Sequence, residues 1–269
     1  MLFRLLALCT CLAAPAGVTA NPYDNLARVE LLPGWRVSEG EHMAGLRITL
    51  RDGWKTYWRA PGDAGIPPEF SFAGSDNVQA VKPQWPVPMV FNQGGYRSIG
   101  YRNSVVFPLS VTLADGGAPT RLSGQIEIGV CEEICLPVSL SFAADLPATG
   151  TREAAITAAL IDRPLTGEEA AIGPVTCAIA PIPDGLQVTA SFAENQPHPE
   201  EVIVIESGDD NVWVSQAAIT REAGRVRAIV DMVHVTGGAF ALDRSALRFT
   251  LLSPDRAVEL RGCQADATP

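Results

Sequence analysis

The chain has 269 residues, which is long enough for about two domains with sizeable hydrophobic cores. Hydrophobic residues make up 47% and charged residues 19%, a composition typical of globular proteins, and the formal net charge is −10. This acidity excludes the broad basic face that nucleic-acid binding needs, so we expect no nucleic-acid partner.

Residues 1–20 have the features of a secretory signal peptide. Arg4 precedes the apolar run Leu5–Ala14, and small residues before a cleavage point follow at Val18-Thr19-Ala20. The apolar run is too short to span a bilayer, and no later segment of the sequence is suited to span one. We therefore expect a mature protein in the periplasm, an oxidising compartment in which disulfide bonds persist.

Alternating apolar residues predict strands in the first half of the chain. Leu46, Ile48 and Leu50 alternate with polar residues, Asp52-Gly53 is a turn signal, and residues 54–58 form an aromatic-rich strand. Residues 83–100 contain several prolines and glycines mixed with aromatic residues. This composition predicts a long irregular segment, which is either a functional cap or a plug at the end of a sandwich.

Cys131 and Cys135 lie between two predicted strands. Cys131 continues the polar parity of the strand before it, which predicts that this side chain faces solvent. One helical turn over residues 132–134 would bring the two sulfurs within bonding distance. An accessible dithiol serves disulfide exchange or binds a soft metal, and the alternative is a structural cystine. No basic residue flanks the pair in sequence, and two glutamates between the cysteines oppose thiolate formation.

The chain changes character after residue 147. The alanine-rich stretch Thr151–Ile161 predicts a short helix within a linker over residues 148–172. Short alternating strands resume over residues 173–265, and the continuous apolar run Val202–Ile205 predicts a central strand. Cys177 and Cys263 bracket this second region, and in a secreted chain we expect them to form a structural disulfide.

Several features of the first half resemble the N-terminal periplasmic domain of the thiol:disulfide interchange protein DsbD and its ScsB-like relatives. These features are Asp52–Trp58, Trp85-Pro86 with the Tyr96–Tyr101 stretch, Val105–Leu109, and a cysteine pair followed by proline. The resemblance covers about residues 30–145. This chain has three residues between its cysteines, whereas that family domain has about five.

The resemblance implies an immunoglobulin-like sandwich that carries its redox cysteines on a hairpin. It implies Cys131 and Cys135 as the redox pair, with Cys135 forming the mixed disulfide with partners. It further implies a cap that includes Phe91 and Tyr96, and Tyr57 as an aromatic residue lining the site. The implied partners are thioredoxin-like electron donors or acceptors with C-x-x-C motifs, and a membrane electron conduit on a separate protein.

The sequence therefore predicts an all-β protein of two immunoglobulin-like β-sandwich domains joined by a short helical linker. The predicted boundaries are a signal peptide at 1–20, a redox domain at 21–147, the linker at 148–172 and a second sandwich at 173–265. The leading hypothesis is a periplasmic thiol–disulfide oxidoreductase that needs no cofactor or metal. A copper-handling protein and a non-catalytic partner-binding protein with structural cystines are the alternatives.

Overall fold

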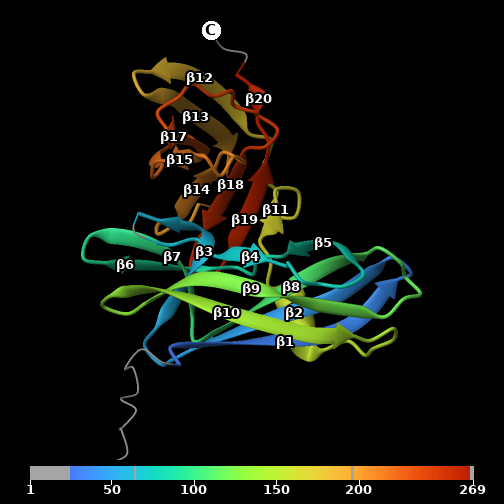
Figure 1. The fold of residues 1–269 in the computed structure, drawn as a ribbon. Helices are drawn as coiled ribbons and strands as arrows, with labels where there is room; N and C mark the ends of the chain where they lie inside the picture. The colour runs from blue at the N-terminus through green and yellow to red at the C-terminus, as the bar shows by residue number, and fades with distance from the viewer. Residues whose placement is uncertain (1–24, 64, 195–196, 267–269) are drawn as a thin grey trace, which may run out of the picture.

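The computed structural model describes residues 25–63, 65–194 and 197–266, so the predicted signal peptide lies outside the described residues. The described chain is almost entirely β-structure and forms two sandwiches, each made of two sheets (Figure 1). The prediction of an all-β, immunoglobulin-like fold is confirmed. In the described part of the chain, no helix has the length and apolar character required to cross a membrane.

The N-terminal sandwich packs a four-stranded sheet against a six-stranded sheet. The first sheet has the order β1-β2-β8-β5. Its strands are β1 (Ala27–Ser38), β2 (Glu41–Leu50), β8 (Ser104–Leu113) and β5 (Val78–Pro83). The second sheet has the order β10-β9-β3-β7-β6, with β4 paired to β9. Its strands are β10 (Cys135–Leu146), β9 (Thr120–Cys131), β3 (Lys55–Gly62), β7 (Tyr96–Arg102), β6 (Met89–Gln93) and β4 (Glu69–Ser71).

The alternating residues of the sequence fill the space between these two sheets. Leu46 and Ile48 on β2, and Ile126 and Ile128 on β9, are fully or almost fully buried in one core. Trp58 is completely buried in the same core. Period-two patterning thus directs one face of each sheet inward, as expected for half-buried strands.

Helix α1 (Ala154–Ile161), the single helix of the described residues, lies within the predicted helical stretch. Its buried residue Ile156 packs with Leu32 and Trp35 on the outer face of the first sheet. Gly45 on β2 allows this approach, because an added Cβ there would lie 2.7 Å from Ile156. The helix is therefore anchored to the N-terminal sandwich.

The C-terminal sandwich has its own core of buried residues between residues 172 and 260. One sheet has the order β11-β19-β18-β14 and the other β15-β17-β13-β12-β20, with β16 paired to β17. The strands of the first sheet are β11 (Leu165–Thr166), β19 (Ala257–Arg261), β18 (Arg248–Leu252) and β14 (Val202–Glu206). Those of the second are β15 (Val212–Val214), β17 (Arg225–His234), β13 (Gly185–Ala193), β12 (Thr176–Ile182), β20 (Gln264–Ala265) and β16 (Ala218–Glu222).

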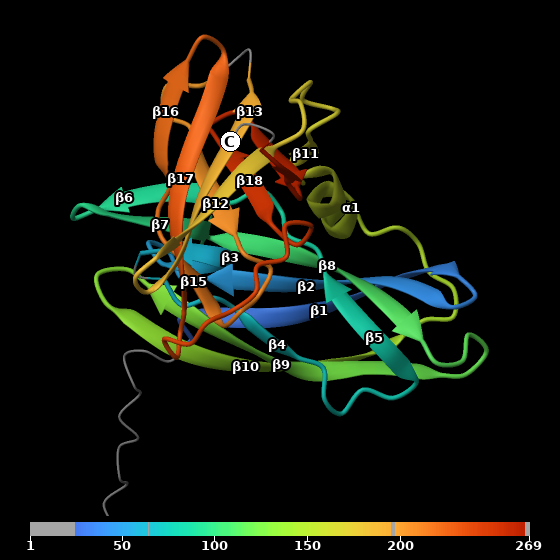
Figure 2. The same cartoon turned by 90° about the horizontal axis from the view of Figure 1, so that it is seen from above.

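The prediction that Val202–Ile205 forms a central strand is wrong, because β14 lies at the edge of its sheet. Its apolar run has another cause. Ile203 and Ile205 enter the C-terminal core, whereas Val204 packs with the core of the N-terminal sandwich, as do Leu252 and Ala257. Both faces of β14 are therefore covered, one of them by the other sandwich. Figures 1 and 2 show the C-terminal sandwich standing on the N-terminal one at this place.

The prediction that residues 83–100 form an irregular segment is confirmed for residues 84–88 and wrong for residues 89–100. Residues 89–93 and 96–100 pair as the antiparallel hairpin β6–β7. Its two-residue turn is Gly94-Gly95, with φ of 61° and 86°. A positive φ at both central residues is what a type I′ hairpin turn requires, and glycine meets that requirement without steric cost.

Candidate active site

Cys131 and Cys135 are bonded at the tip of the β9–β10 hairpin. They stand directly opposite each other in the antiparallel register, with a Cα–Cα distance of 4.2 Å and an S–S distance of 2.11 Å. The three-residue loop between them is closed by the Glu132 amide, which donates to the carbonyl oxygen of Ile134 at 3.2 Å. The predicted helical turn is therefore wrong, and cross-strand pairing brings the sulfurs together instead.

The two cysteines differ sharply in exposure. Cys135 is exposed, whereas Cys131 is only 1% exposed. The prediction that Cys131 faces solvent is thus wrong, although its position on the outer parity of β9 is as expected. The reason is that other segments cover the outer face of the sheet at this end.

Tyr57 from the neighbouring strand β3 provides much of that cover. Its hydroxyl donates a hydrogen bond to Cys131 Sγ at 2.8 Å and lies 3.1 Å from Cys135 Sγ. Burial raises the pKa of the Tyr57 hydroxyl above its usual value of 10.0, so this group keeps its proton at neutral pH. It therefore remains a hydrogen-bond donor to whichever sulfur carries negative charge.

Gly129 makes room for the Tyr57 ring. A Cβ at this position would lie 3.0 and 3.1 Å from two carbons of that ring and 2.8 Å from Cβ of Ile66. Tyr57 and Ile66 thus lie over the bare backbone of β9, two residues before Cys131. The sequence contains the signal, a glycine on the strand next to the cysteine, but gives no indication of which ring fills the space.

Lys55 is a second residue that sequence spacing did not indicate. It stands opposite Cys131 in the register between β3 and β9, so the structure places a basic residue beside the pair. Its ammonium group lies 3.1 Å from Ser98 Oγ and 5.1 Å from the centre of the Phe91 ring. Burial, and secondarily the charge of Arg102, lower the pKa of Lys55. No acidic partner neutralises this cation among the described residues.

The predicted cap residues lie on the adjacent hairpin β6–β7. Phe91 is half-buried and lies under two cations, Lys55 at 5.1 Å and Arg102 at 5.2 Å. Tyr96 follows the glycine turn and is 66% exposed. Figures 1 and 2 show the tips of the β6–β7 and β9–β10 hairpins at the same end of the N-terminal sandwich. The aromatic residue that touches the sulfurs is nevertheless Tyr57.

Cys177 and Cys263 are bonded in the C-terminal sandwich, with a Cα–Cα distance of 5.7 Å. Cys177 on β12 is 1% exposed and belongs to the core, and Cys263 packs against that core. This bond links strand β12 to the segment between β19 and β20.

Metal-binding side chains are not gathered in the described residues. Within ranges 25–63, 65–194 and 197–266, no group of three or more His, Cys, Asp or Glu residues is arranged to hold a metal ion. His42 is buried on β2, where its ring nitrogen lies 2.6 Å from the Pro33 carbonyl oxygen.

The N-terminal sandwich thus displays a cystine at a hairpin tip, with one sulfur buried under a tyrosine hydroxyl, an arrangement that suits disulfide exchange. Residues 28–147 match the family model described as the N-terminal domain of the thiol:disulfide interchange protein DsbD. The resemblance of about residues 30–145 to the DsbD N-terminal domain is therefore confirmed for this part of the chain.

The complete fold also has a structural relative. It is similar to the crystal structure of the N-terminal periplasmic domain of ScsB from Proteus mirabilis, with a TM-score of 0.68 and 22% sequence identity. The match covers 92% of this chain and 96% of that chain, so the relative shares both sandwiches. A comparison with curated protein sequences found no match.

Proposed function

We propose that this protein relays electrons by thiol–disulfide exchange through Cys131 and Cys135. The observation that carries the proposal is the asymmetry of the pair, in which Cys135 is exposed and Cys131 is buried against the Tyr57 hydroxyl. Exchange needs one sulfur that a partner thiolate can reach and another that leaves as a stabilised thiolate. This arrangement supports Cys135 as the first and Cys131 as the second.

The reaction transfers two electrons without a cofactor or metal. A partner thiolate attacks Cys135 Sγ, the bond between the two cysteine sulfurs breaks, and Cys131 leaves as a thiolate. A second thiolate of the partner then attacks the mixed disulfide at the partner's own sulfur and releases Cys135. The partner dithiol becomes a disulfide, and Cys131 and Cys135 become the reduced pair. The same steps in reverse pass the two electrons to an acceptor disulfide.

Two groups favour the leaving thiolate. The Tyr57 hydroxyl donates to Cys131 Sγ at 2.8 Å, and hydrogen bonding to a charged form favours that form. Lys55 stands opposite Cys131 in the sheet and adds a nearby positive charge. Glu132 and Glu133 are exposed at the tip, where solvent weakens their repulsion of the thiolate.

The partners we propose are thioredoxin-like proteins with C-x-x-C motifs, with a membrane electron conduit as the ultimate donor. The site of action we propose is the periplasm, reached through the signal peptide at residues 1–20. The domain division we propose is a redox domain at 21–147, a helical linker at 148–172 and a second sandwich at 173–265. Support comes from the DsbD family match and from the periplasmic relative of similar fold.

We also propose that hairpin β6–β7 shields the cystine from small thiols, with Phe91 and Tyr96 as its aromatic residues. The hairpin tip lies at the same end of the sandwich as the cystine, and its Phe91 holds Lys55, the cross-strand neighbour of Cys131. A docking partner would displace this shield, whereas a small thiol has no docking energy to do so.

Trapping of the mixed disulfide tests the proposed relay. In the Cys131→Ala variant, Cys135 is left without its resolving partner and should accumulate as a mixed disulfide with thioredoxin-like proteins when expressed in the periplasm. The matched control is Cys135→Ala, which retains the buried sulfur and should trap far less. Equal trapping by the two variants, or none by either, would contradict the assigned roles.

A further inference from the structure

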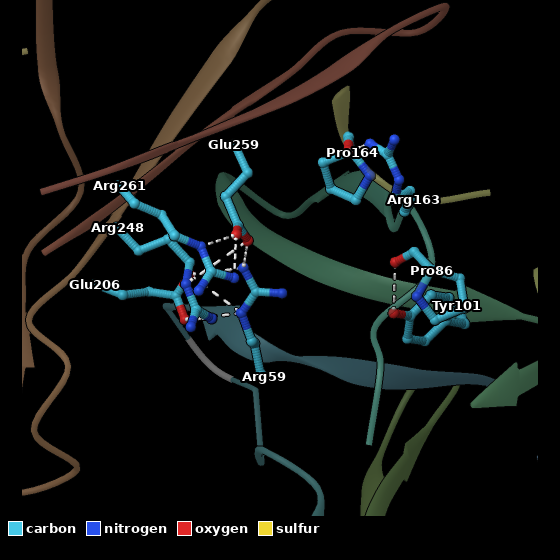
Figure 3. A network of polar contacts seen from close by, with 9 residues as sticks. All are labelled: Arg59, Pro86, Tyr101, Arg163, Pro164, Glu206, Arg248, Glu259 and Arg261. Atoms are coloured by element: carbon cyan, nitrogen blue, oxygen red, sulfur yellow. Dashed lines mark hydrogen bonds and ion pairs between the residues drawn. The ribbon is translucent and has the colours of Figure 1, made fainter. Parts of the chain in front are cut away.

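A large cleft lies between the two sandwiches and is lined by residues of both. Its volume is about 1260 Å³. From the N-terminal sandwich, residues 82–85 at the end of β5 line the cleft. The rest of the lining includes residues 163–167, which contain β11, residues 243–245, and residues of the neighbouring strands β18 and β19. Figure 3 looks into this region, with Arg163 and Pro164 across from the residues of the C-terminal sandwich.

The walls of this cleft are basic in a protein that is acidic overall. Six lining residues are basic and two are acidic, whereas the whole chain has a formal charge of −10. The basic residues are Arg59, Lys82, Arg163, Arg244, Arg248 and Arg261, and the acidic ones are Asp243 and Glu259. The cleft therefore gathers positive charge against the overall balance of the protein.

Internal ion pairs cancel only part of this charge. Arg59 on β3 reaches Glu206 at 2.9 Å and Glu259 at 2.8 Å across the domain boundary. Arg248 lies 3.6 Å from both carboxylates, and Arg261 lies 2.7 Å from Glu259 (Figure 3). Three arginines thus share two carboxylates, and one positive charge remains. The Arg261 side chain is 66% exposed, so its guanidinium is open to a ligand.

Two further cations at the cleft lack a carboxylate. The Arg244 guanidinium donates to the Cys177 carbonyl oxygen at 2.7 Å. Neither Arg244 nor Lys82 forms an ion pair within the described ranges of the chain. Arg163, in contrast, is paired with Glu169 at 2.6 Å. The uncompensated charge is therefore that of Lys82 and Arg244, together with the one excess charge of the three arginines that share Glu206 and Glu259.

The remaining lining mixes apolar residues with the polar side chains of Gln84, Thr166, Ser245 and Gln264, and the cleft is larger than a typical small-molecule site. Trp85, Leu165, Ile172, Val175 and Leu260 all contribute to its walls. Pockets for drug-sized ligands have volumes of roughly 300–1,000 Å³. A cleft of about 1260 Å³ that combines basic and apolar side chains suits an extended stretch of polypeptide better than a single small ion.

We propose that this cleft binds an acidic polypeptide segment of a partner protein, in which Asp or Glu residues alternate with apolar ones. Arginine forks recognise carboxylates through paired hydrogen bonds, and clusters of arginine are a recurring means of binding acidic motifs. The apolar residues of such a segment would pack on Trp85 and on Leu165, which is 37% exposed. This proposal does not depend on the proposed relay, because no cleft residue touches Cys131 or Cys135.

Peptide binding to the full oxidised chain tests the proposal. The probe is a fluorescein-labelled peptide, Glu-Leu-Glu-Asp-Leu-Glu-Asp-Leu, followed by fluorescence anisotropy. We expect saturable binding that weakens as salt rises, because salt screens the charge pairing. The same peptide with Gln and Asn in place of the acids should bind at least about tenfold more weakly, a difference of one decade in Kd.

Matched variants locate the binding site. Arg261→Gln and Lys82→Gln should together weaken acidic-peptide binding by about tenfold, or one decade in Kd. The control is Arg121→Gln, which removes an exposed arginine paired with Asp145 on the N-terminal sandwich, outside the cleft. It should leave Kd within about twofold. Both variants change exposed side chains, and thermal unfolding of each will show that the fold is retained.

Three results would overturn the proposal. They are equal binding of the acidic and neutral peptides, an unchanged Kd in the Arg261/Lys82 double variant, and no peptide binding alongside tight binding of inorganic tripolyphosphate. The last result would make the cleft a site for small anions instead. If the peptide binds and the trapping variants capture no protein, the cleft proposal stands and the relay proposal fails.

Discussion

Replacing Tyr57 with Phe isolates the contribution of one hydroxyl to the chemistry of the cystine. The ring remains over Gly129, so shielding is preserved, and only the donor 2.8 Å from Cys131 Sγ is lost. A hydrogen bond to a charged group contributes about 1.5–3 kcal/mol. The hydroxyl meets a neutral disulfide before exchange and a thiolate after it, so most of this stabilisation belongs to the reduced form.

Two measurable effects follow from that magnitude. If the variant destabilises the Cys131 thiolate by about 1.5–3 kcal/mol, the reduction potential should fall by roughly 30–60 mV, since about 30 mV corresponds to 1.4 kcal/mol for a two-electron couple. About half of the change should be felt in the transition state, given a Brønsted coefficient of roughly 0.4–0.5. Reduction by dithiothreitol should therefore slow by about 3- to 10-fold.

Stopped-flow tryptophan fluorescence would give the rate, and equilibration with glutathione would give the potential. The matched control is Tyr101→Phe, which removes a buried hydroxyl that donates to the Pro86 carbonyl oxygen at 2.9 Å. That variant should change stability without changing either redox measurement. If Tyr57→Phe leaves both rate and potential at the parent values, Tyr57 acts only by packing and our assignment of the leaving thiolate is wrong.

Three further predictions concern other parts of the molecule. Removal of the second cystine by Cys263→Ser should lower the midpoint of thermal unfolding. It should leave unchanged the rate at which dithiothreitol reduces the Cys131–Cys135 disulfide. An altered rate would show that the second cystine affects the reactivity of the first. The double change Phe91→Ala with Tyr96→Ala should speed reduction by glutathione severalfold while changing the rate with a thioredoxin-like donor less, and parallel changes in both rates would argue against a shield. Burial, and secondarily the neighbouring Glu201, raise the pKa of Glu194 above 4.5, so the folded protein binds this proton more tightly than the unfolded chain does. The free energy of unfolding should then fall as pH rises from 4.5 through the raised pKa. Urea titrations at several pH values should show that this free energy depends less on pH in Glu194→Gln than in the parent protein. An identical pH dependence in the two proteins would show that Glu194 is not the cause.

The strands were largely predictable because period-two burial is a local property of the sequence. The alternation at 46–50 and at 122–130 lies within β2 and β9, and both strands direct the expected side chains inward. The family resemblance over residues 30–145 was likewise carried by local motifs, and the match over 28–147 confirms it.

The features that escaped prediction all depend on contacts between distant segments. Parity placed Cys131 on the outer face of β9, but Tyr57, 74 positions away, covers that face. The apolar run of β14 indicated burial on both faces correctly, yet one covering layer is the other sandwich and not a neighbouring strand. A pattern of apolar residues along a strand indicates which faces of the strand are buried, but it does not indicate which segment of the chain covers them.

The positions at which charged residues gather in the fold also depend on contacts between distant segments. Arg59 and Glu259 are 200 positions apart in sequence and meet across the domain boundary. Neither lies in a charge run that would mark a binding surface. The basic character of the cleft arises only when both sandwiches are assembled.

The order of the cysteines along the chain bears on how the protein acquires its bonds. Of the four cysteines in the described residues, the first two form one cystine, with a separation of 4, and the last two form the other, with a separation of 86. Each cysteine therefore bonds to its immediate neighbour in chain order. If oxidation proceeds from the N-terminus as the polypeptide emerges into an oxidising compartment, sequential pairing yields the native bonds directly. Maturation should then need an oxidant but no disulfide isomerase.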